Sequence, residues 1–424
     1  MVDIQGRLQG KRLTVAHFLD EVVEHGAEGC SYLLATDAEM RPVEGYGSWE
    51  RGYEDFVLKP DLSTLRFVPW QEGTALVICD VARKDGSPVA GSPRREILRR
   101  QLRRLAGHGL EALVGTELEF LVFRNSYEEA WHKGYSKLVP ANLYNANYSL
   151  LATARIEPLL RRIRNSMAGA GLAVEAAVGE CNLGQHEINL RYGPALSAAD
   201  GHAIYKNGAK EIAAQEGCSI TFMPKFDEGP GNSCHVHVSL HDEYGTPVFA
   251  DERGFSATFE HFLAGQLACL RELALLFAPN INSYKRYAPG SFAPTRLAWG
   301  KDNRTCTLRV VGRGPRLRIE NRVPGGDANP YLAIAAMIAA GLHGMETGLP
   351  MEEEFVSNAY EAAGKRGLPG TLREARELFA NSEIARRAFG TEVVEHYLNA
   401  ASVEIEAFET SVTDWERYRN FERT

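Results

Sequence analysis

The sequence predicts an α+β protein in which a small β-rich domain precedes a larger domain of strands and helices. Three observations support this fold class. Short strand-like runs with turn signals between them fill most of the N-terminal part, and strands and helices alternate through the rest. Pairs of polar residues also recur at alternate positions of three later strands. That pattern fits a curved sheet with one hydrated face and a back covered by helices.

The N-terminal part is expected to contain one helix and four short strands. Apolar residues in the segment 9–26 recur as they would on one face of a helix. Strand-like runs bounded by turn residues follow at 30–37, 44–49, 64–69 and 74–82. Pro93 opens a basic helix that continues to about Leu105. We therefore expect one domain over residues 1–105 and a second over residues 106–424.

The second domain is expected to supply most of the core. Its predicted strands lie at 111–124, 172–179, 184–192, 218–224, 233–240, 305–311 and 316–322. Its predicted helices lie at 155–170, 197–216, 254–278, 328–345, 371–379 and 391–409. The longest apolar run, YLAIAAMIAAGL at 331–342, is too short to span a bilayer and predicts a buried helix.

The composition is that of an ordinary soluble globular protein, with 44% hydrophobic and 24% charged residues and a net charge of −8. No stretch interleaves lysine and arginine with aromatic residues, so nucleic acid is not an expected partner. The N-terminus lacks the apolar run of a signal peptide, and no membrane partner is expected. Seven cysteines without a CxxC pair indicate reduced thiols, so we expect a cytoplasmic location.

Acidic residues and histidines are placed for binding metal ions. Glu117 and Glu119 of GTELEF are two residues apart, so both side chains point to one face of a strand. The same spacing recurs in His235 and His237 and in Glu320 and Arg322, and further carboxylates lie at Glu180 and Glu187. Taken alone, the strands that carry Glu117 and Glu187 fit a half-exposed structural strand about as well as a metal site, whereas the pair of histidines favours a functional site. Clustered carboxylates repel one another unless a cation lies between them, and mostly oxygen ligands favour Mg²⁺ or Mn²⁺ over zinc.

Arginines accompany these carboxylates. They are Arg286, Arg304, Arg309, Arg318 and Arg322. Arginine binds carboxylates and phosphates with two parallel hydrogen bonds. Any one of these arginines alone fits a solvated surface, but arginines and metal ligands together indicate phosphoryl transfer. The chain has no GxxxxGK[ST] motif, so it is not a P-loop enzyme.

Taken together, these motifs resemble the glutamine synthetase family over nearly the whole chain. The matching segments occur in the family's order, at 45–61 (GxGS and LKPD), 117–119 (ExE), 180–188 (GQxEI), 235–239 (HxHxS), 282–290 (NSYKR and PG), 303–309 (NR and R) and 318–322 (RIExR). Seven ordered motifs are far more specific than any one of them. The resemblance implies an N-terminal β-grasp domain and a catalytic domain with a curved antiparallel sheet.

The resemblance also implies an assembly and a reaction. The family forms rings of six subunits, sometimes stacked to twelve, with each active site between neighbours. In the implied reaction ATP phosphorylates the γ-carboxylate of L-glutamate, with two to three Mg²⁺ or Mn²⁺ ions in the site. An amine then attacks the γ-glutamyl phosphate and forms an amide.

Roles follow from the matching positions. The ligands of the metal near the substrate carboxylate match Glu119, Glu180 and Glu187, and those of the metal on the ATP phosphates match Glu117, His235 and Glu320. Glutamate-binding positions match Gly231, His237, Arg286 and Arg322. The catalytic arginines match Arg304 and Arg309, together with Arg286. Nucleotide contacts match Tyr192, Ser239, Arg309 and Arg318.

Two departures from the family concern the amine. Enzymes of the family that use ammonia have two acids at the ammonium site, and here Tyr46 and Phe292 stand at those positions. Anionic partners offset the desolvation of a small cation, whereas aromatic rings favour apolar carbon. We therefore expect Tyr46 and Phe292 to select an organic monoamine over ammonia.

Other interpretations remain open at this stage. A polyamine such as putrescine would need a carboxylate to bind its second charge. An ordinary glutamine synthetase would need both of the missing acids. A non-catalytic member of the family is the least favoured, because all six metal-ligand positions are filled. The sequence names neither the amine nor the base that deprotonates it, for which Glu50 and Asp55 are candidates. It also does not distinguish a hexamer from a dodecamer.

Overall fold

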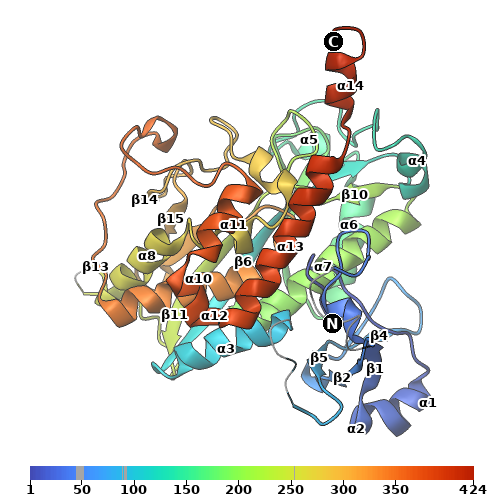
Figure 1. Cartoon of the computed structure of the whole chain (residues 1–424), viewed down its shortest axis with the longest axis horizontal. Coiled ribbons are helices and arrows are strands. Elements are labelled where there is room, and N and C mark those ends of the chain that lie inside the picture. Colours follow the sequence, from blue (N-terminus) through green and yellow to red (C-terminus); the bar gives the residue numbers. More distant parts are fainter. Residues whose placement is uncertain (44–51, 88, 90–92, 253) are drawn as a thin grey trace.

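The computed structural model describes residues 1–43, 52–87, 89, 93–252 and 254–424. The N-terminal part forms its own small sheets beside the larger body, as Figure 1 shows in blue. Strands β1 (Ala27–Cys30), β2 (Asp55–Pro60) and β5 (Cys79–Ala82) pair antiparallel in the order β1-β2-β5. Strands β3 (Arg66–Phe67) and β4 (Ala75–Leu76) form a separate hairpin.

Two N-terminal predictions were wrong in detail. The helix begins at Val15 rather than residue 9, because Thr14 caps it, and it runs through α1 (Val15–His17), a π-helical turn (Phe18–Val22) and α2 (Val23–His25). The apolar run expected as a strand at 30–37 instead forms a 3-10 turn at Ser31–Leu34. The strand lies just before that turn, where Gly29 leaves room for the ring of Phe56. The strand expected at 44–49 lies outside the described residues.

The second domain is built on a nine-stranded sheet in the order β14-β15-β16-β11-β6-β8-β7, with β9 and β10 beside β6. The predicted strands are β6 (Leu110–Phe123), β7 (Val174–Gly179), β8 (Gln185–Leu190), β10 (Ser219–Thr221), β11 (Cys234–Asp242), β15 (Leu308–Val311) and β16 (Arg318–Asn321). Strands β9 (Gly193–Pro194) and β14 (Trp299–Lys301) were not predicted. Every pairing in this sheet is antiparallel except β14 with β15, so the predicted fold class is confirmed.

The helices also follow the prediction closely. The predicted ones are α3 (Arg94–Ala106), α6 (Glu157–Gly169), α7 (Ala195–Gln215), α8 (Ala257–Cys269), α10 (Pro330–Thr347), α11 (Leu372–Ala380) and α13 (Thr391–Thr410). Helix α9 (Ala274–Phe277) is separate from α8, so the single helix expected at 254–278 is interrupted. Short helices α4 (Tyr127–His132), α5 (Leu150–Thr153), α12 (Glu383–Phe389) and α14 (Asp414–Asn420) were not predicted.

Helix α10 is the centre of the helical layer. Fourteen of its eighteen residues are buried, which confirms the buried helix predicted from the apolar run. Gly265 of α8 faces it so closely that a Cβ there would lie 2.1 Å from the Ala340 carbonyl oxygen. Among the described helices, none has both the length and the apolar character that crossing a membrane demands.

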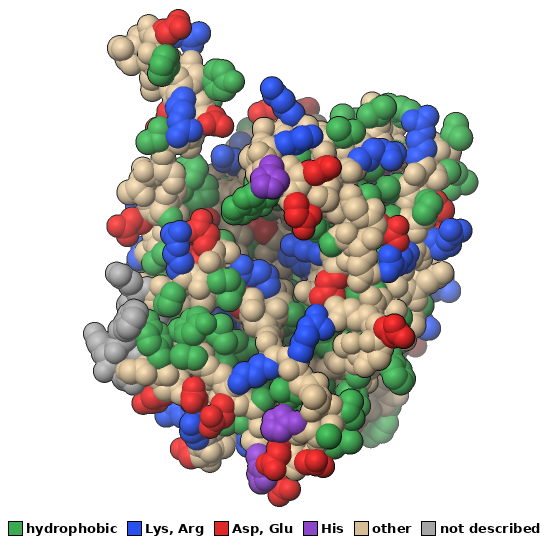
Figure 2. All heavy atoms as spheres, turned by 90° about the vertical axis from the view of Figure 1, so that its right-hand side faces the viewer, with side chains coloured by type: hydrophobic (Ala, Val, Ile, Leu, Met, Phe, Trp, Pro, Cys, Tyr) green, Lys and Arg blue, Asp and Glu red, His purple; other side chains and the backbone are tan. Residues whose placement is uncertain are grey.

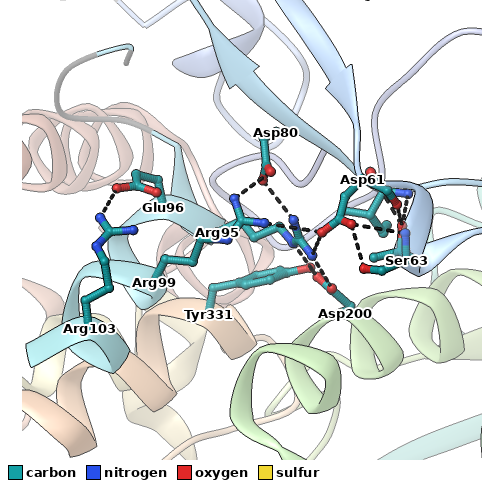
Figure 3. A network of polar contacts seen from close by, with 11 residues as sticks. Asp61, Ser63, Asp80, Arg95, Glu96, Arg99, Arg103, Asp200 and Tyr331 are labelled. Carbon is teal, nitrogen blue, oxygen red and sulfur yellow. Dashed lines mark hydrogen bonds and ion pairs between the residues drawn. The ribbon is translucent and has the colours of Figure 1, made fainter. Parts of the chain in front are cut away.

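An ionic network joins the N-terminal strands to helices α3, α7 and α10 (Figure 3). Arg95 of α3 donates two hydrogen bonds to Asp200 of α7, at 3.0 and 2.8 Å. It also binds Asp80 of β5 at 2.9 Å and Asp61, just after β2, at 2.7 Å. The Tyr331 hydroxyl of α10 donates to Asp200 at 2.6 Å. Arg95 therefore ties two N-terminal carboxylates to two helices of the second domain.

Candidate active site

The site is organised by β6, the long strand at the middle of the sheet. Glu117 and Glu119 lie on one face of it, as predicted, but each is next to a different neighbouring strand. Glu117 is opposite His235 of β11, whereas Glu119 is opposite Glu187 of β8. On the far side of β11, Glu320 of β16 pairs with His237. The strand register therefore divides the predicted ligands into two groups.

The first group is Glu117, His235 and Glu320, whose ligand atoms all lie within 4.8 Å of one another. His235 Nδ1 is 3.3 Å from Glu117 and 3.4 Å from Glu320. Burial and the positive charge of Arg322 lower the pKa of His235, so its imidazole is held neutral, the form that binds metals. A neutral imidazole between two carboxylates suits a divalent cation.

Glu320 is the most enclosed of these ligands. Its side chain is fully buried and is bound by Arg309 at 2.9 Å and by Arg322. Burial alone would raise the pKa of Glu320, but His235 and Arg322 hold it at about 2. Glu117 behaves in the same way, because hydrogen bonds with His235 and His237 hold its pKa far below the usual value despite burial. Both carboxylates are therefore charged at any physiological pH.

The second group is Glu119, Glu180 and Glu187, whose ligand oxygens also lie within 4.8 Å of one another. Among the described residues no arginine forms an ion pair with these carboxylates. Burial and the charges of Glu119 and Glu117 raise the pKa of Glu180 to about 7, and burial with the same charges raises the pKa of Glu187 well above its usual value. Three crowded carboxylates, of which Glu180 and Glu187 have raised pKa values, form a site that suits a divalent cation.

Metal binding at the second group is expected to depend on pH. Below pH 7 Glu180 holds a proton that a metal ion must displace, so Mn²⁺ affinity should fall about tenfold between pH 8 and pH 6. A carboxyl whose folded pKa is raised also makes the metal-free protein less stable as pH rises from about 4.5 to about 7. The gap in melting temperature with and without Mn²⁺ should therefore widen from pH 6 to pH 8. A gap that narrows over this interval would contradict the assignment.

Of the predicted glutamate-side residues, Gly231 lies beside the second group, because Gln185 donates to both Gly231 and Glu119, whereas Arg322 binds Glu320 of the first group. Arg286 is 2% exposed, and its guanidinium donates to the carbonyl oxygens of Arg322 and Val323, both at 3.0 Å. Gly231 packs against it so closely that a Cβ at Gly231 would lie 3.1 Å from Arg286 Cγ. Arg322 Nε is buried and has no hydrogen-bond partner among the described residues. It is a donor that a ligand carboxylate would satisfy.

Of the two arginines assigned to the transferring phosphate, only Arg309 is bound into the site. It bridges Glu320 and Asp302, and its side chain is largely buried. The Arg304 side chain is 57% exposed, and its ion pair with Asp302 is long, at 4.0 Å. Arg304 is therefore free to swing towards a bound phosphate, whereas Arg309 is already fixed beside one metal group.

A groove of about 340 Å³ opens beside Glu117. It is lined by the predicted nucleotide residues Tyr192, Ser239 and Arg318, and also by His237. His237 binds Glu117 at 3.0 Å through Nε2 and accepts from Arg318 at 3.3 Å through Nδ1. The resemblance placed His237 with the glutamate-binding residues. In the structure His237 lines the same groove as Tyr192, Ser239 and Arg318.

Of the two aromatic residues of the predicted amine pocket, Phe292 is among the described residues. Tyr46 lies outside the described residues, and so does Glu50. Phe292 has a left-handed backbone with φ of 60° and a side chain that is well exposed. Arg322 donates to its carbonyl oxygen at 3.4 Å, which places Phe292 next to the first metal group. Asp55, the other candidate base, lies on β2 and pairs with Lys84 at 3.4 Å.

Sequence reasoning missed several residues that support the site. Gln185 donates to Gly231 and Glu119, at 3.0 and 3.3 Å. Tyr360 lies near enough to Arg322 and Arg286 for their charges to oppose the rise in its pKa that burial causes. Its sequence segment had no recognisable strand or helix pattern. Gln185 could have been found from its place in the GQxEI motif, whereas Tyr360 had no sequence signal.

A comparison with known families decides what this site belongs to. The family described as the glutamine synthetase catalytic domain matches residues 90–420, most of the chain. The chain belongs to the glutamine synthetase family. In this glutamine synthetase relative all six family ligand positions fall into the two groups described above. The match includes helix α3, and the domain boundary at residue 105 stays a prediction.

Individual relatives are similar over almost the full chain. Gamma-glutamylethanolamide synthetase GlnA4 of Streptomyces coelicolor is 62% identical over 423 residues, which cover 99% of this chain and 91% of the relative. Glutamate–isopropylamine ligase of a Pseudomonas species is 39% identical over 427 residues, with 99% and 93% covered. The solved structure of a GmaS/ADP complex superposes with a TM-score of 0.85 at 27% identity and covers 99% of this chain and 95% of its own.

Proposed function

We propose that this protein is an ATP-dependent glutamate–amine ligase whose preferred amine is ethanolamine. The observation that carries the reaction is the pair of adjacent three-ligand groups, with the nucleotide groove on one side and buried arginines on the other. The proposal of ethanolamine as the amine rests on the 62% identity to a gamma-glutamylethanolamide synthetase and on Phe292 in place of an acid.

In the first step a γ-carboxylate oxygen of L-glutamate attacks the γ-phosphorus of ATP, and ADP leaves. Two or more Mg²⁺ or Mn²⁺ ions, held by the two groups, would neutralise the phosphate charge when bound. Arg286 and Arg322 would orient the substrate carboxylate, and Arg309 would stabilise charge on the transferring phosphoryl group. Tyr192, Ser239, His237 and Arg318 would hold the nucleotide in the groove.

In the second step the amine nitrogen attacks the acyl carbon of γ-glutamyl phosphate, phosphate leaves, and the nitrogen gives up a proton. An alkylamine is mostly protonated at neutral pH because its pKa is near that of lysine, about 10.4. The carboxylates of the second group, where Glu180 and Glu187 have raised pKa values, would accept this proton. The exposed ring of Phe292 offers apolar surface to the carbon chain of an amine and no anion to ammonium.

Replacing Phe292 tests this account of amine choice. Phe292→Glu restores an acid at the position where ammonia-using relatives have one. The ratio of kcat/KM for ammonium to kcat/KM for ethanolamine should rise at least about tenfold, since one charged hydrogen bond is worth that much. Phe292→Gln has nearly the same shape without the charge and serves as the control. An unchanged ratio in Phe292→Glu would show that Phe292 does not face the amine.

The proposed function is tested by phosphate release from Mg·ATP and L-glutamate with ethanolamine, isopropylamine, putrescine or ammonium. We expect fastest release with ethanolamine, slower release with isopropylamine and little with ammonium. Release with putrescine alone would instead support the polyamine alternative. Release with ammonium alone would identify an ordinary glutamine synthetase, and none with any amine would favour a non-catalytic role.

We further propose that the enzyme works in the cytoplasm as a ring of six or twelve subunits. The described residues leave large apolar side chains exposed on segment 131–151 and on α14, where Trp415, Tyr418 and Phe421 are exposed. Figure 2 shows α14 extending beyond the body, above a face on which acidic and basic side chains are interspersed. Light scattering coupled to size-exclusion chromatography would distinguish a ring from a monomer.

A further inference from the structure

Three segments meet at Arg286, and the proposed mechanism gives no role to the side chains that join them. We call the segments 224–231, 281–287 and 322–327 the substrate cradle. We propose that Asn282 and Asp327 are positioning residues that hold Arg286 and Gly231 in the geometry that L-glutamate requires. This inference rests on the proposed function, because that function makes Arg286 and Gly231 the glutamate side of the site.

Asp327 fixes the start of the short helix that carries Arg286. That helix, η4 (Ile281–Arg286), begins at Asn280, which forms a capping box with Ser283. One oxygen of Asp327 accepts hydrogen bonds from Asn280 Nδ2 at 2.8 Å and from Ser283 Oγ at 2.5 Å. Because the cap and its partner share this one acceptor, Asp327 determines where η4 starts.

Arg286 fixes the other end of the same helix to the same segment. Its two hydrogen bonds to the carbonyl oxygens of Arg322 and Val323 lie four to five residues before Asp327. The Tyr287 hydroxyl also donates to Val323, at 2.9 Å. Helix η4 is therefore held to segment 322–327 at both ends. A guanidinium that is 2% exposed has little freedom to reorient, so the backbone of η4 decides where it lies.

Asn282 joins η4 to the segment that ends at Gly231. Its side-chain amide donates to the Lys225 carbonyl at 2.8 Å and accepts from the Lys225 N–H at 2.9 Å. This two-point contact resembles the pairing of neighbouring strands and permits only one register. A Cβ at Gly231 would lie 2.0 Å from the Pro224 carbonyl oxygen, so the backbone of this segment is already tightly packed against itself. Asn282 therefore sets the distance between Gly231 and Arg286.

A change at either residue should act on glutamate more than on ATP. The proposed nucleotide groove is lined by residues of β6, β7, β8, β11 and β16 and by neighbouring turns, and takes none of its lining from the cradle. A displacement of about 1 Å at a positioned group can cost a hundredfold in rate. Loss of the Asn282 contact should therefore appear as weaker glutamate binding while the metal groups stay intact.

The test uses the full-length protein and the variants Asn282→Ala, Asn282→Asp, Asp327→Ala and Asp327→Asn. Asn282→Ala should raise KM for L-glutamate about tenfold or more and change KM for ATP less than about twofold. Asp327→Ala should do the same. Asn282→Asp keeps only the acceptor and should give an intermediate value, whereas Asp327→Asn keeps an oxygen for Asn280 and Ser283 and should recover most of the loss. Asp414→Ala on the exposed helix α14 is the control.

A second measurement does not depend on turnover. L-glutamate alone should raise the melting temperature of the wild type, and this shift should be lost in Asn282→Ala while the shift caused by Mn²⁺ remains. Equal losses for glutamate and ATP, or a glutamate shift like that of the wild type, would overturn the inference. Absence of phosphate release from the wild type would refute the proposed function, and the glutamate shift would still decide the role of the cradle.

Discussion

Glu187→Gln is expected to inactivate the enzyme and at the same time to stabilise the metal-free protein. Loss of one ligand from the second group should lower kcat by at least about a thousandfold with Mg²⁺. The stabilising effect follows from the pKa of Glu187, which burial, Glu117 and Glu119 raise well above its usual value. A raised pKa means that the charged carboxylate destabilises the folded state above pH 7, and glutamine removes that charge. The melting temperature at pH 8 without metal should rise by about 1–3 °C.

Glu320→Gln is the matched comparison, because it removes one ligand from the other group. It should also inactivate, but it should lower the melting temperature with or without metal. Glu320 is paired with Arg309 and Arg322, so neutralising it leaves two buried cations without their anion. Opposite signs of the stability change would support the division into two groups. The same sign in both variants would contradict it.

Arg95→Met is expected to cause the largest loss of stability of any change considered. Arg95 is the shared partner of Asp200, Asp61 and Asp80, and its removal leaves Asp200 charged at 3% exposure. Breaking a buried ion pair from one side typically costs about 3–5 kcal/mol. Since Asp61 and Asp80 lie in the N-terminal part of the chain, unfolding should begin in that part. Urea unfolding should show a lower midpoint, and hydrogen exchange should speed up first in β2 and β5.

Arg103→Met on the same helix is the control for this prediction. Arg103 is 62% exposed and pairs only with Glu96 among the described residues, so its loss should cost less than about 1 kcal/mol. The double variant Arg95→Met with Asp200→Asn should recover part of the stability, because it removes the stranded charge. A similar cost for both single variants would show that the network does not join the domains.

Much of the fold was predictable because its elements carry strong local patterns. Seven strands of the large sheet and the long helices were found from periodicity, and the apolar run of α10 identified its buried centre. The short helices α4, α5, α12 and α14 were missed, because one or two turns carry too little periodicity to recognise. The strand at Ala27–Cys30 was predicted in the wrong place. Gly29 has no side chain, which lets the ring of Phe56 pack against the strand there, and the sequence pattern does not show this contact.

The sequence by itself predicted the carboxylates and the histidine that form two groups able to hold divalent metals. The reason is local, since residues two apart on a strand share a face, and the ordered motifs also indicated the family. Only the tertiary structure decided how Glu117 and Glu119 separate, because that depends on which strands flank β6. It also decided that His237 lines the groove beside Glu117 and that Asn282 meets Lys225. These contacts join segments far apart in the chain, and no local pattern encodes them.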